Sequence, residues 1–222
     1  MVGNNIFGAD KGAYVSFNSG NTFSIISGSS NSNRQITRNY LTSNGFPMLF
    51  VYGNNNDYLK ICSTSGSSVQ NITGSGLGYW YDAVMSNDTK YILASKGIAP
   101  YEDNQTVYLS SNSGTTFTAI SGMTGLSTVT CSVSDDGQYM MVTSSTYFAP
   151  DGNIWVSNNY GVNWTLVESS PSYFFSGGDI SSNGKTMAAV GNGLLWLNQN
   201  FGSGSFIQIE PSSDPNWVVI GR

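Results

Sequence analysis

The sequence predicts an all-β protein in which one unit of four strands is repeated along the chain. Three observations predict this class. A polar box with a central glycine recurs at near-constant spacing, a second polar turn recurs between the boxes, and short runs of β-branched and aromatic residues flank both. Residues that build long helices are scarce, because only 9% of the 222 residues are charged whereas glycine alone contributes 26.

The recurring box is a polar turn with a glycine at its centre. It reads Ser-Phe-Asn-Ser-Gly-Asn-Thr-Phe over residues 16–23 and Ser-Ser-Asn-Ser-Gly-Thr-Thr-Phe over residues 110–117. The five glycines, separated by 46, 48, 47 and 41 residues, are Gly20, Gly66, Gly114, Gly161 and Gly202. Glycine is expected at this place because the turn requires a positive φ angle.

A second turn lies midway between successive boxes and joins two short apolar runs. One copy is Val-Ser-Asp-Asp-Gly over residues 133–137, followed by the apolar run 139–142. Such a turn between apolar runs predicts a hairpin, so each repeat contains four strands. In the fourth repeat we expect them at about 127–133, 139–145, 153–157 and 163–168, which is the strand pattern of a β-propeller blade.

The whole chain is therefore expected to form a single five-bladed β-propeller with four antiparallel strands in each blade. The expected blades are residues 217–222 plus 1–27, then 35–73, 80–120, 127–169 and 175–210. The chain begins at the second strand of a blade, and the run Trp217–Ile220 offers the missing inner strand. We therefore expect the C-terminal strand to join the N-terminal blade, which closes the ring and leaves no unpaired sheet edge there.

Composition excludes several function classes. The net charge of −5 with only 8 Lys and Arg residues argues against nucleic-acid binding, and the absence of His removes Ser-His-Asp catalysis and His-ligated zinc. No apolar run is long enough for a membrane helix, and the N-terminus does not resemble a signal peptide.

We expect no cofactor or metal. Cys62 and Cys131 are expected to be buried thiols of different blades, the alternative being one disulfide.

The box resembles the Asp-box, or BNR, repeat, Ser-x-Asp-x-Gly-x-Thr-Trp, of sialidases, sortilin-type receptors and many secreted, phage and large-virus proteins. The Asp position is occupied here by Asn18, Thr64, Asn112, Asn159 and Asn200. The aromatic position is occupied by Phe23, Val69, Phe117, Trp164 and Phe206. The resemblance implies a structural motif, in which the polar side chain accepts backbone N–H groups and the aromatic residue packs between sheets.

Catalytic residues are not assigned. Sialidases that share the box use an arginine triad on six blades, whereas this chain has only Arg34, Arg38 and Arg222, two of them in one segment. Other glycoside hydrolases need two carboxylates about 5–10 Å apart. Asp82 and Asp179 lie on expected inner strands, but at different levels, so hydrolysis is the less favoured alternative.

The loops opposite the box turns are the expected ligand face. Two of them combine aromatic and acidic residues with a proline, and two segments that lead into inner strands add further rings. Rings can stack on sugars while carboxylates accept bonds from sugar hydroxyls. The candidate ligand-binding residues are Tyr101, Glu102, Asp103, Tyr147, Phe148, Asp151, Trp80 and Tyr173. The alternative for Trp80 is that it fills a gap between blades, and the alternative for the acids, together with Asp57, is calcium ligation or plain solvation.

These features predict a non-enzymatic surface protein with a binding or structural role, associated with a virus or phage particle. Its expected partners are glycans or proteins bound through the loop face. The low charge and the abundance of Asn, Ser and Thr favour a place on a virion surface or outside the cell. A soluble carbohydrate-binding lectin is the alternative.

Overall fold

The computed structural model describes residues 2–4, 12–29, 36, 38–43, 45–52, 56–64, 68–98, 104–145, 152–170, 175–192, 194–198 and 206–209. Within these ranges the regular structure is strand, apart from one short 3-10 helix, η1 (Thr73–Ser75). The predicted all-β class is confirmed.

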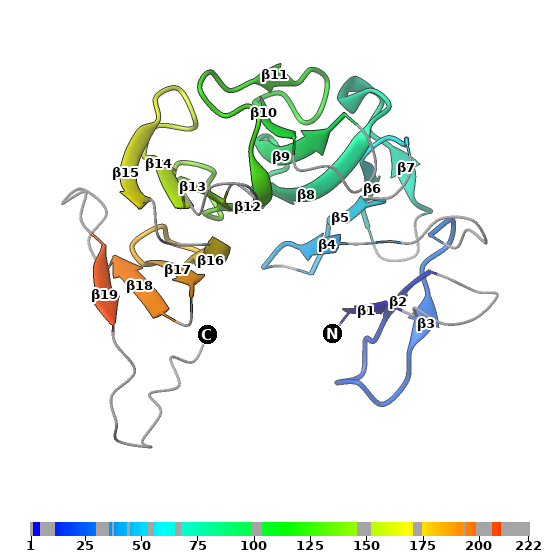
Figure 1. Ribbon diagram of the computed structural model, residues 1–222. Coiled ribbons are helices and arrows are strands. Elements are labelled where there is room, and N and C mark those ends of the chain that lie inside the picture. Colours follow the sequence, from blue (N-terminus) through cyan, green and yellow to red (C-terminus); the bar gives the residue numbers. More distant parts are fainter. Residues whose placement is uncertain are drawn as a thin grey trace.

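The described strands form five antiparallel sheets that follow one another along the chain (Figure 1). The first sheet has three strands, β1 (Val2–Asn4), β2 (Ala13–Val15) and β3 (Ser24–Ile25). The second has β4 (Arg38–Leu41), β5 (Met48–Val51), β6 (Lys60–Cys62) and β7 (Gln70–Asn71). The third has β8 (Tyr79–Met85), β9 (Ile92–Gly97), β10 (Gln105–Ser110) and β11 (Thr118–Ala119).

The last two sheets have the same four-stranded form. The fourth sheet has β12 (Ser127–Val133), β13 (Met140–Ser145), β14 (Gly152–Ser157) and β15 (Thr165–Ser170). The fifth has β16 (Phe175–Ile180), β17 (Met187–Gly191), β18 (Leu194–Asn198) and β19 (Ile207–Ile209). Strands in each sheet pair in chain order, and those of the fourth repeat lie within two residues of the positions expected from sequence.

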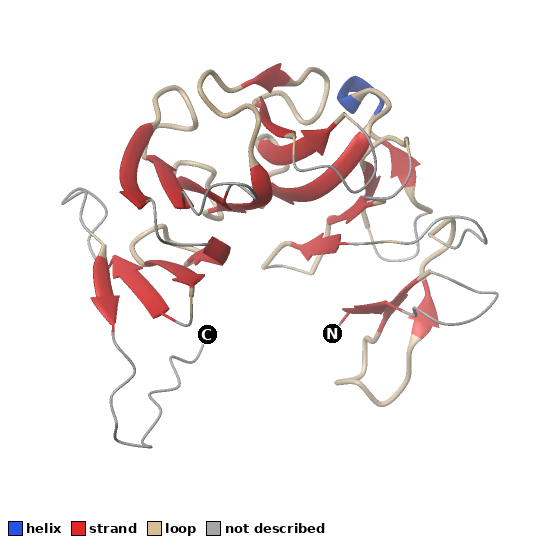
Figure 2. Cartoon of the chain, in the orientation of Figure 1, coloured by secondary structure: helices blue, strands red, loops and turns tan. Residues whose placement is uncertain are grey.

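The sheets fan around an arc (Figure 2), and the labels of Figure 1 show that the first strand of each four-stranded sheet lies toward the inside of this arc. Strand β4 packs against β8, β8 against β12, and β12 against β16. In the part of the chain that the structure describes, the arc is open between the first and fifth sheets (Figure 1). The strand expected at 217–222 lies outside the described residues, so closure of the ring stays a prediction.

The hydrophobic core is a series of layers between consecutive sheets. One cluster joins the first and second sheets, another the second and third, another the third and fourth, and another the fourth and fifth. Strands β5 and β13 are buried along their whole length because a neighbouring sheet covers each face. This layering explains why the strands read as short apolar runs rather than as alternating patterns.

The box turns have one hydrogen-bonding plan. Asn18 Oδ1 accepts the N–H of Thr22 at 2.8 Å, and the side-chain oxygens of Asn112 and Asn159 accept the equivalent N–H at 3.0 and 2.9 Å. The glycine of each turn has a positive φ, as predicted: 88° at Gly20, 79° at Gly114 and 77° at Gly161. Gly66 and Gly202 lie outside the described residues.

The aromatic residue of the box packs toward the preceding sheet. Phe117 packs against the cluster between the second and third sheets, and Trp164 packs against the cluster between the third and fourth sheets. Phe23 departs from this expectation, because its side chain is 44% exposed. The described part of the chain places no preceding sheet beside the first one, which accounts for the difference.

The turns between first and second strands converge near the axis of the arc. Ser43 Oγ donates to Asp135 Oδ2 at 2.9 Å, although the third sheet lies between the two sheets that carry these residues. The N–H of Asn87 donates to the carbonyl of Asp135, and the N–H of Asp135 donates to that of Ser182, each at 2.9 Å. Because the strands are antiparallel, these turns and the box turns share one edge, which we call the box face, and the remaining loops form the loop face.

Candidate ligand-binding site

Most of the ligand residues expected from sequence lie outside the described residues. They are Tyr101, Glu102, Asp103, Tyr147, Phe148, Asp151 and Tyr173. Their roles stay predictions. The structure does describe Trp80 and the strands to which these loops are joined, so the site can be built from those positions.

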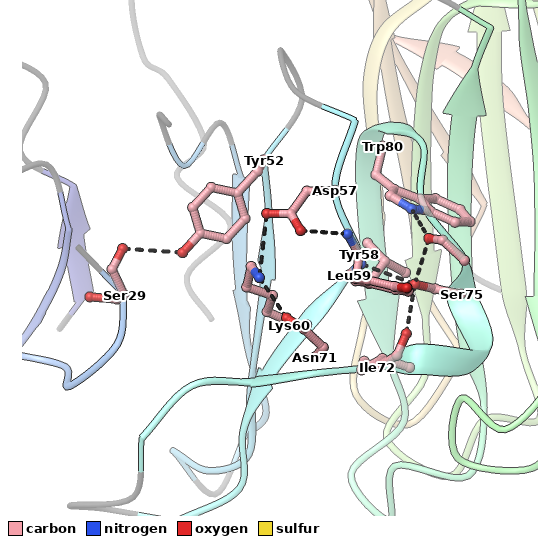
Figure 3. Close-up of polar contacts among 11 residues, drawn as sticks. Ser29, Tyr52, Asp57, Tyr58, Leu59, Lys60, Asn71, Ile72, Ser75 and Trp80 are labelled. Atoms are coloured by element: carbon pink, nitrogen blue, oxygen red, sulfur yellow. Dashed lines mark hydrogen bonds and ion pairs between the residues drawn. The ribbon is translucent and has the colours of Figure 1, made fainter. Parts of the chain in front are cut away.

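Trp80 fills the space between the second and third sheets. Its side chain is 1% exposed, and its ring lies 5.9 Å from that of Tyr108 and 5.8 Å from that of Phe117. Its Nε1 group donates to the carbonyl of Gly76 at 3.5 Å (Figure 3). A ring enclosed in this way cannot stack on a ligand, so the structure favours the gap-filling alternative over the ligand-binding role.

A cavity of about 270 Å³ opens on the loop face beside Trp80, between the second and third sheets. Its walls come from the segment before β6, the start of β8, the end of β9 and the middle of β10. The lining residues are Asn56, Leu77, Gly78, Tyr79, Lys96, Gly97, Ile98, Thr106 and Tyr108. Sequence analysis did not single out this set, because its members come from four separate segments.

Asp57 stabilises one wall of this cavity. Its backbone exchanges two hydrogen bonds with Gly78, at 3.1 and 3.0 Å, and so joins the second sheet to the third. Its carboxylate accepts the N–H of Tyr58 at 2.8 Å and lies 3.3 Å from Lys60 Nζ (Figure 3). With 4% of its surface exposed, Asp57 is a buried structural acid rather than a solvated loop charge.

Lys96 places a positive charge in the cavity. Its Nζ group donates to the carbonyl of Leu77 at 2.8 Å and lies 5.1 Å from the centre of the Trp80 ring. A side chain at position 78 would overlap the end of the Lys96 side chain, so the glycine there leaves the space that Lys96 occupies. Partial burial lowers the pKa of the Lys96 ammonium below its ordinary 10.5, because desolvation disfavours the charged form.

The rim of the cavity is apolar. Leu77 is 51% exposed and Ile98 is 70% exposed. Residues 99–103 follow Ile98 directly, so the segment that contains Tyr101, Glu102 and Asp103 begins at this rim. The cavity and the predicted ligand loop are therefore neighbours along the chain.

The two acids of the inner strands bind neighbouring strands. Asp82 Oδ2 accepts a hydrogen bond from the N–H of Cys131 at 2.8 Å, and Asp179 Oδ1 accepts one from the hydroxyl of Ser132 at 2.9 Å. Tyr40 lies near the same axis, where burial, with the charges of Asp135 and Asp179, raises its pKa to about 12. These contacts join sheets, so they give both acids a structural role.

Burial raises the pKa of Asp82 above its ordinary 3.8, and the N–H of Cys131, the charge of Arg38 and the N–H of Ala83 offset only part of this rise. The folded chain therefore binds this proton more tightly than the unfolded chain. We expect the Asp82 contribution to stability to be largest below pH 3.8 and to fall as the pH rises toward the raised pKa.

Urea unfolding of the wild type and Asp82→Asn between pH 3.5 and 8 tests this expectation. The free energy of unfolding of the variant, relative to that of the wild type, should increase with pH and then level off. Asp88→Asn, on an exposed turn, is the matched control for loss of one charge. A difference that stays constant with pH would contradict the assignment to Asp82.

Both cysteines are free thiols, as expected from their separation. Burial raises the pKa of the Cys131 thiol well above its ordinary 9.0, and the Asp82 charge adds to this rise. A protonated, enclosed thiol is a poor nucleophile.

Within the described ranges, no three Cys, Asp or Glu side chains gather at a metal-binding distance, and no helix is long and apolar enough to cross a membrane.

Comparison with known proteins shows the fold. No protein-family model and no curated protein sequence matches the chain. A GH74 xyloglucanase from Xanthomonas campestris matches with a TM-score of 0.63 at 12% identity, over 90% of this chain and 34% of the enzyme. TolB from Acinetobacter baumannii matches with a TM-score of 0.64 at 16% identity, over 92% of this chain and 50% of TolB.

The β-propeller domain of Cps50 (Swd1) from Myceliophteria thermophila matches with a TM-score of 0.53 at 13% identity, over 86% of this chain and 63% of that domain chain. The fold is that of a β-propeller protein. The chain spans about a third of the xyloglucanase and half of TolB, so the likeness concerns the architecture and not the activities of those proteins.

Proposed function

We propose that this chain is a non-enzymatic binding propeller that recognises a glycan on its loop face. The observation that supports the proposal is the cavity lined by Tyr79 and Tyr108 together with Asn56 and Thr106. Tyrosine rings can cover the apolar face of a sugar, and the amide and hydroxyl groups can bind its hydroxyls. The volume of about 270 Å³ lies just below the ~300 Å³ at which ligand pockets usually begin, which suits one sugar ring.

Replacing Tyr79 with alanine tests the proposal. Glycan-array screening of the wild type identifies a ligand, and calorimetric titration then compares the two proteins. We expect binding by Tyr79→Ala to be at least about ten-fold weaker, because one wall of the cavity is lost. Tyr14→Ala, a half-buried tyrosine on β2, is the matched control. Unchanged affinity in Tyr79→Ala would place the ligand elsewhere, and no glycan binding by the wild type would overturn the proposal.

A protein partner is the second candidate, and the exposed rim favours it. Leu77 and Ile98 present apolar surface beside the cavity. The fully buried core of a protein interface is more apolar than the rest of the protein surface. This candidate would be favoured if the wild type binds no sugar but captures a protein partner, and if Leu77→Glu no longer captures that partner.

The setting that we propose is the surface of a virus or phage particle, or otherwise the space outside the cell. The low charge and the high content of Asn, Ser, Thr and Gly support this setting. Immunogold electron microscopy of purified particles tests it directly. Particles without label, together with free protein in the medium, would favour a soluble lectin instead.

We also propose that the ring has five blades and is closed by residues 217–222 beside β1. Exposed apolar residues at both ends of the arc support this. Phe23 is exposed in the first sheet, whereas Phe117 and Trp164, at the same place in their boxes, pack against the clusters that join their sheets to the preceding ones. In the fifth sheet Val190 is exposed, whereas its equivalent Thr143 is fully buried. Contact between the two ends would cover these side chains.

The absence of catalysis is part of the proposal, and the contacts of Asp82 and Asp179 support it because both acids join neighbouring strands. A panel of fluorogenic glycosides, including a sialoside, tests it. Turnover that disappears in Asp82→Asn would assign a hydrolase and overturn the proposal.

A further inference from the structure

We infer that the loop-face cavity selects a glycan with a carboxylate group, such as a uronic acid, which pairs with the ammonium of Lys96. This inference rests on the proposed function and adds the class of sugar to it. The cavity, the position of the lysine within it and the lack of a carboxylate partner for it among the described residues are the three observations behind it.

The first step concerns the surroundings of Lys96. An ammonium has three N–H donors, and the described residues supply a single acceptor, the carbonyl of Leu77 at 2.8 Å. The buried acid Asp57, whose backbone is bonded to Gly78 of the cavity, is paired with Lys60 at 3.3 Å and also accepts the N–H of Tyr58. Its charge is therefore already balanced. Among the described side chains, Lys96 thus has no anionic partner of its own.

The second step concerns the energetic state of this charge. The ammonium is partly removed from water by Trp80 and by the cavity walls, which lowers its pKa. The attraction between an anion and a partly desolvated cation is screened less by water than it is at the fully exposed surface. In a chain with a net charge of −5, this lysine is a local site of positive charge.

The third step concerns the type of anion. A single lysine is a compact point charge that balances one negative charge, and the described lining has no arginine fork that could hold an anion in a bidentate manner. The other polar lining groups, Asn56 and Thr106, are neutral. Gly97 adds no side chain to the lining, which leaves room for a ring beside Lys96. One carboxylate on a hydroxyl-rich ring matches this set of groups.

Calorimetric titration of the full chain tests the inference with three oligosaccharides of equal length. One is neutral, one contains glucuronic acid in place of glucose, and one is sulfated. We expect the wild type to bind the uronic-acid sugar about ten-fold more tightly than the neutral one. Lys96→Met should remove this preference, so that the neutral and uronic-acid sugars bind equally, while Lys96→Arg should keep part of it. Lys185→Met, on an exposed turn, is the matched control.

A pH series adds a second readout. Because the free ammonium has a lowered pKa, the preference for the uronic-acid sugar should decline as the pH rises through that value, while neutral binding stays constant. Thermal unfolding confirms that each variant is folded.

The outcomes separate the two proposals. Equal affinity for the neutral and uronic-acid sugars overturns the inference and leaves glycan binding intact. A preference for the sulfated sugar replaces the carboxylate with a different anion and also overturns it. Binding of an acidic peptide that requires Lys96, without binding of any sugar, overturns both this inference and the proposed function.

Discussion

Replacing Trp80 with alanine is expected to lower the free energy of unfolding by about 3–5 kcal/mol. Trp80 is among the largest fully buried side chains, and it contacts the rings of Tyr108 and Phe117 and the ammonium of Lys96. Alanine would leave a void between the second and third sheets. The neighbouring strands cannot collapse into it, because the backbone bonds between Asp57 and Gly78 hold the two sheets at a fixed separation.

Chemical denaturation followed by circular dichroism measures this loss. Trp80→Phe should be destabilised less than Trp80→Ala, since a smaller ring fills part of the space. Val162→Ala, at a position with 76% exposure, is the control for removal of an apolar side chain that is not enclosed. If Trp80→Ala unfolds at the same denaturant concentration as the wild type, Trp80 does not fill the gap as described.

Removing residues 217–222 is expected to prevent accumulation of soluble, folded protein. If this segment supplies the inner strand of the first blade, its loss exposes the edge of β1 and uncovers the apolar surface that includes Phe23. The segment contains four consecutive apolar residues, Trp217–Ile220, and each one buried contributes about 1.5–3 kcal/mol.

Expression of the full and truncated chains, followed by fractionation and thermal unfolding, checks this. A second variant, Val219→Asp, keeps the length of the chain and places a charge in the proposed strand, so it should also lower the melting temperature. A truncated chain that melts like the full one would contradict closure by this segment.

The sequence predicted the repeating units well because turn chemistry is local. Each box contains its own acceptor and its own glycine, so Asn112 and Gly114 form the same bonds as Asn18 and Gly20 without help from distant residues. The four-stranded antiparallel sheets follow from these turns. The arrangement of the sheets in an arc depends on contacts between sheets, which no local pattern encodes.

The candidate site was harder to predict because it depends on distant segments. Asn56, Tyr79, Lys96 and Tyr108 meet only when the second and third sheets pack together. The sequence shows an aromatic run at the start of β8, but alternation along the strand decides which of these rings faces the core. Trp80 points into the layer between sheets, while Tyr79 reaches the cavity. At the strand position equivalent to Lys96, the fourth repeat has Ser144, so the repeat pattern gives no signal for the lysine.

The hydrogen bond between Ser43 and Asp135 has a consequence for how this protein can evolve. It spans two sheets that are not neighbours, and such a distance can be bridged only when few sheets surround the centre. In the proposed closed ring of five blades, insertion of one more repeat would widen the centre and pull these two side chains apart. Such an insertion would therefore have to be accompanied by new residues at both positions.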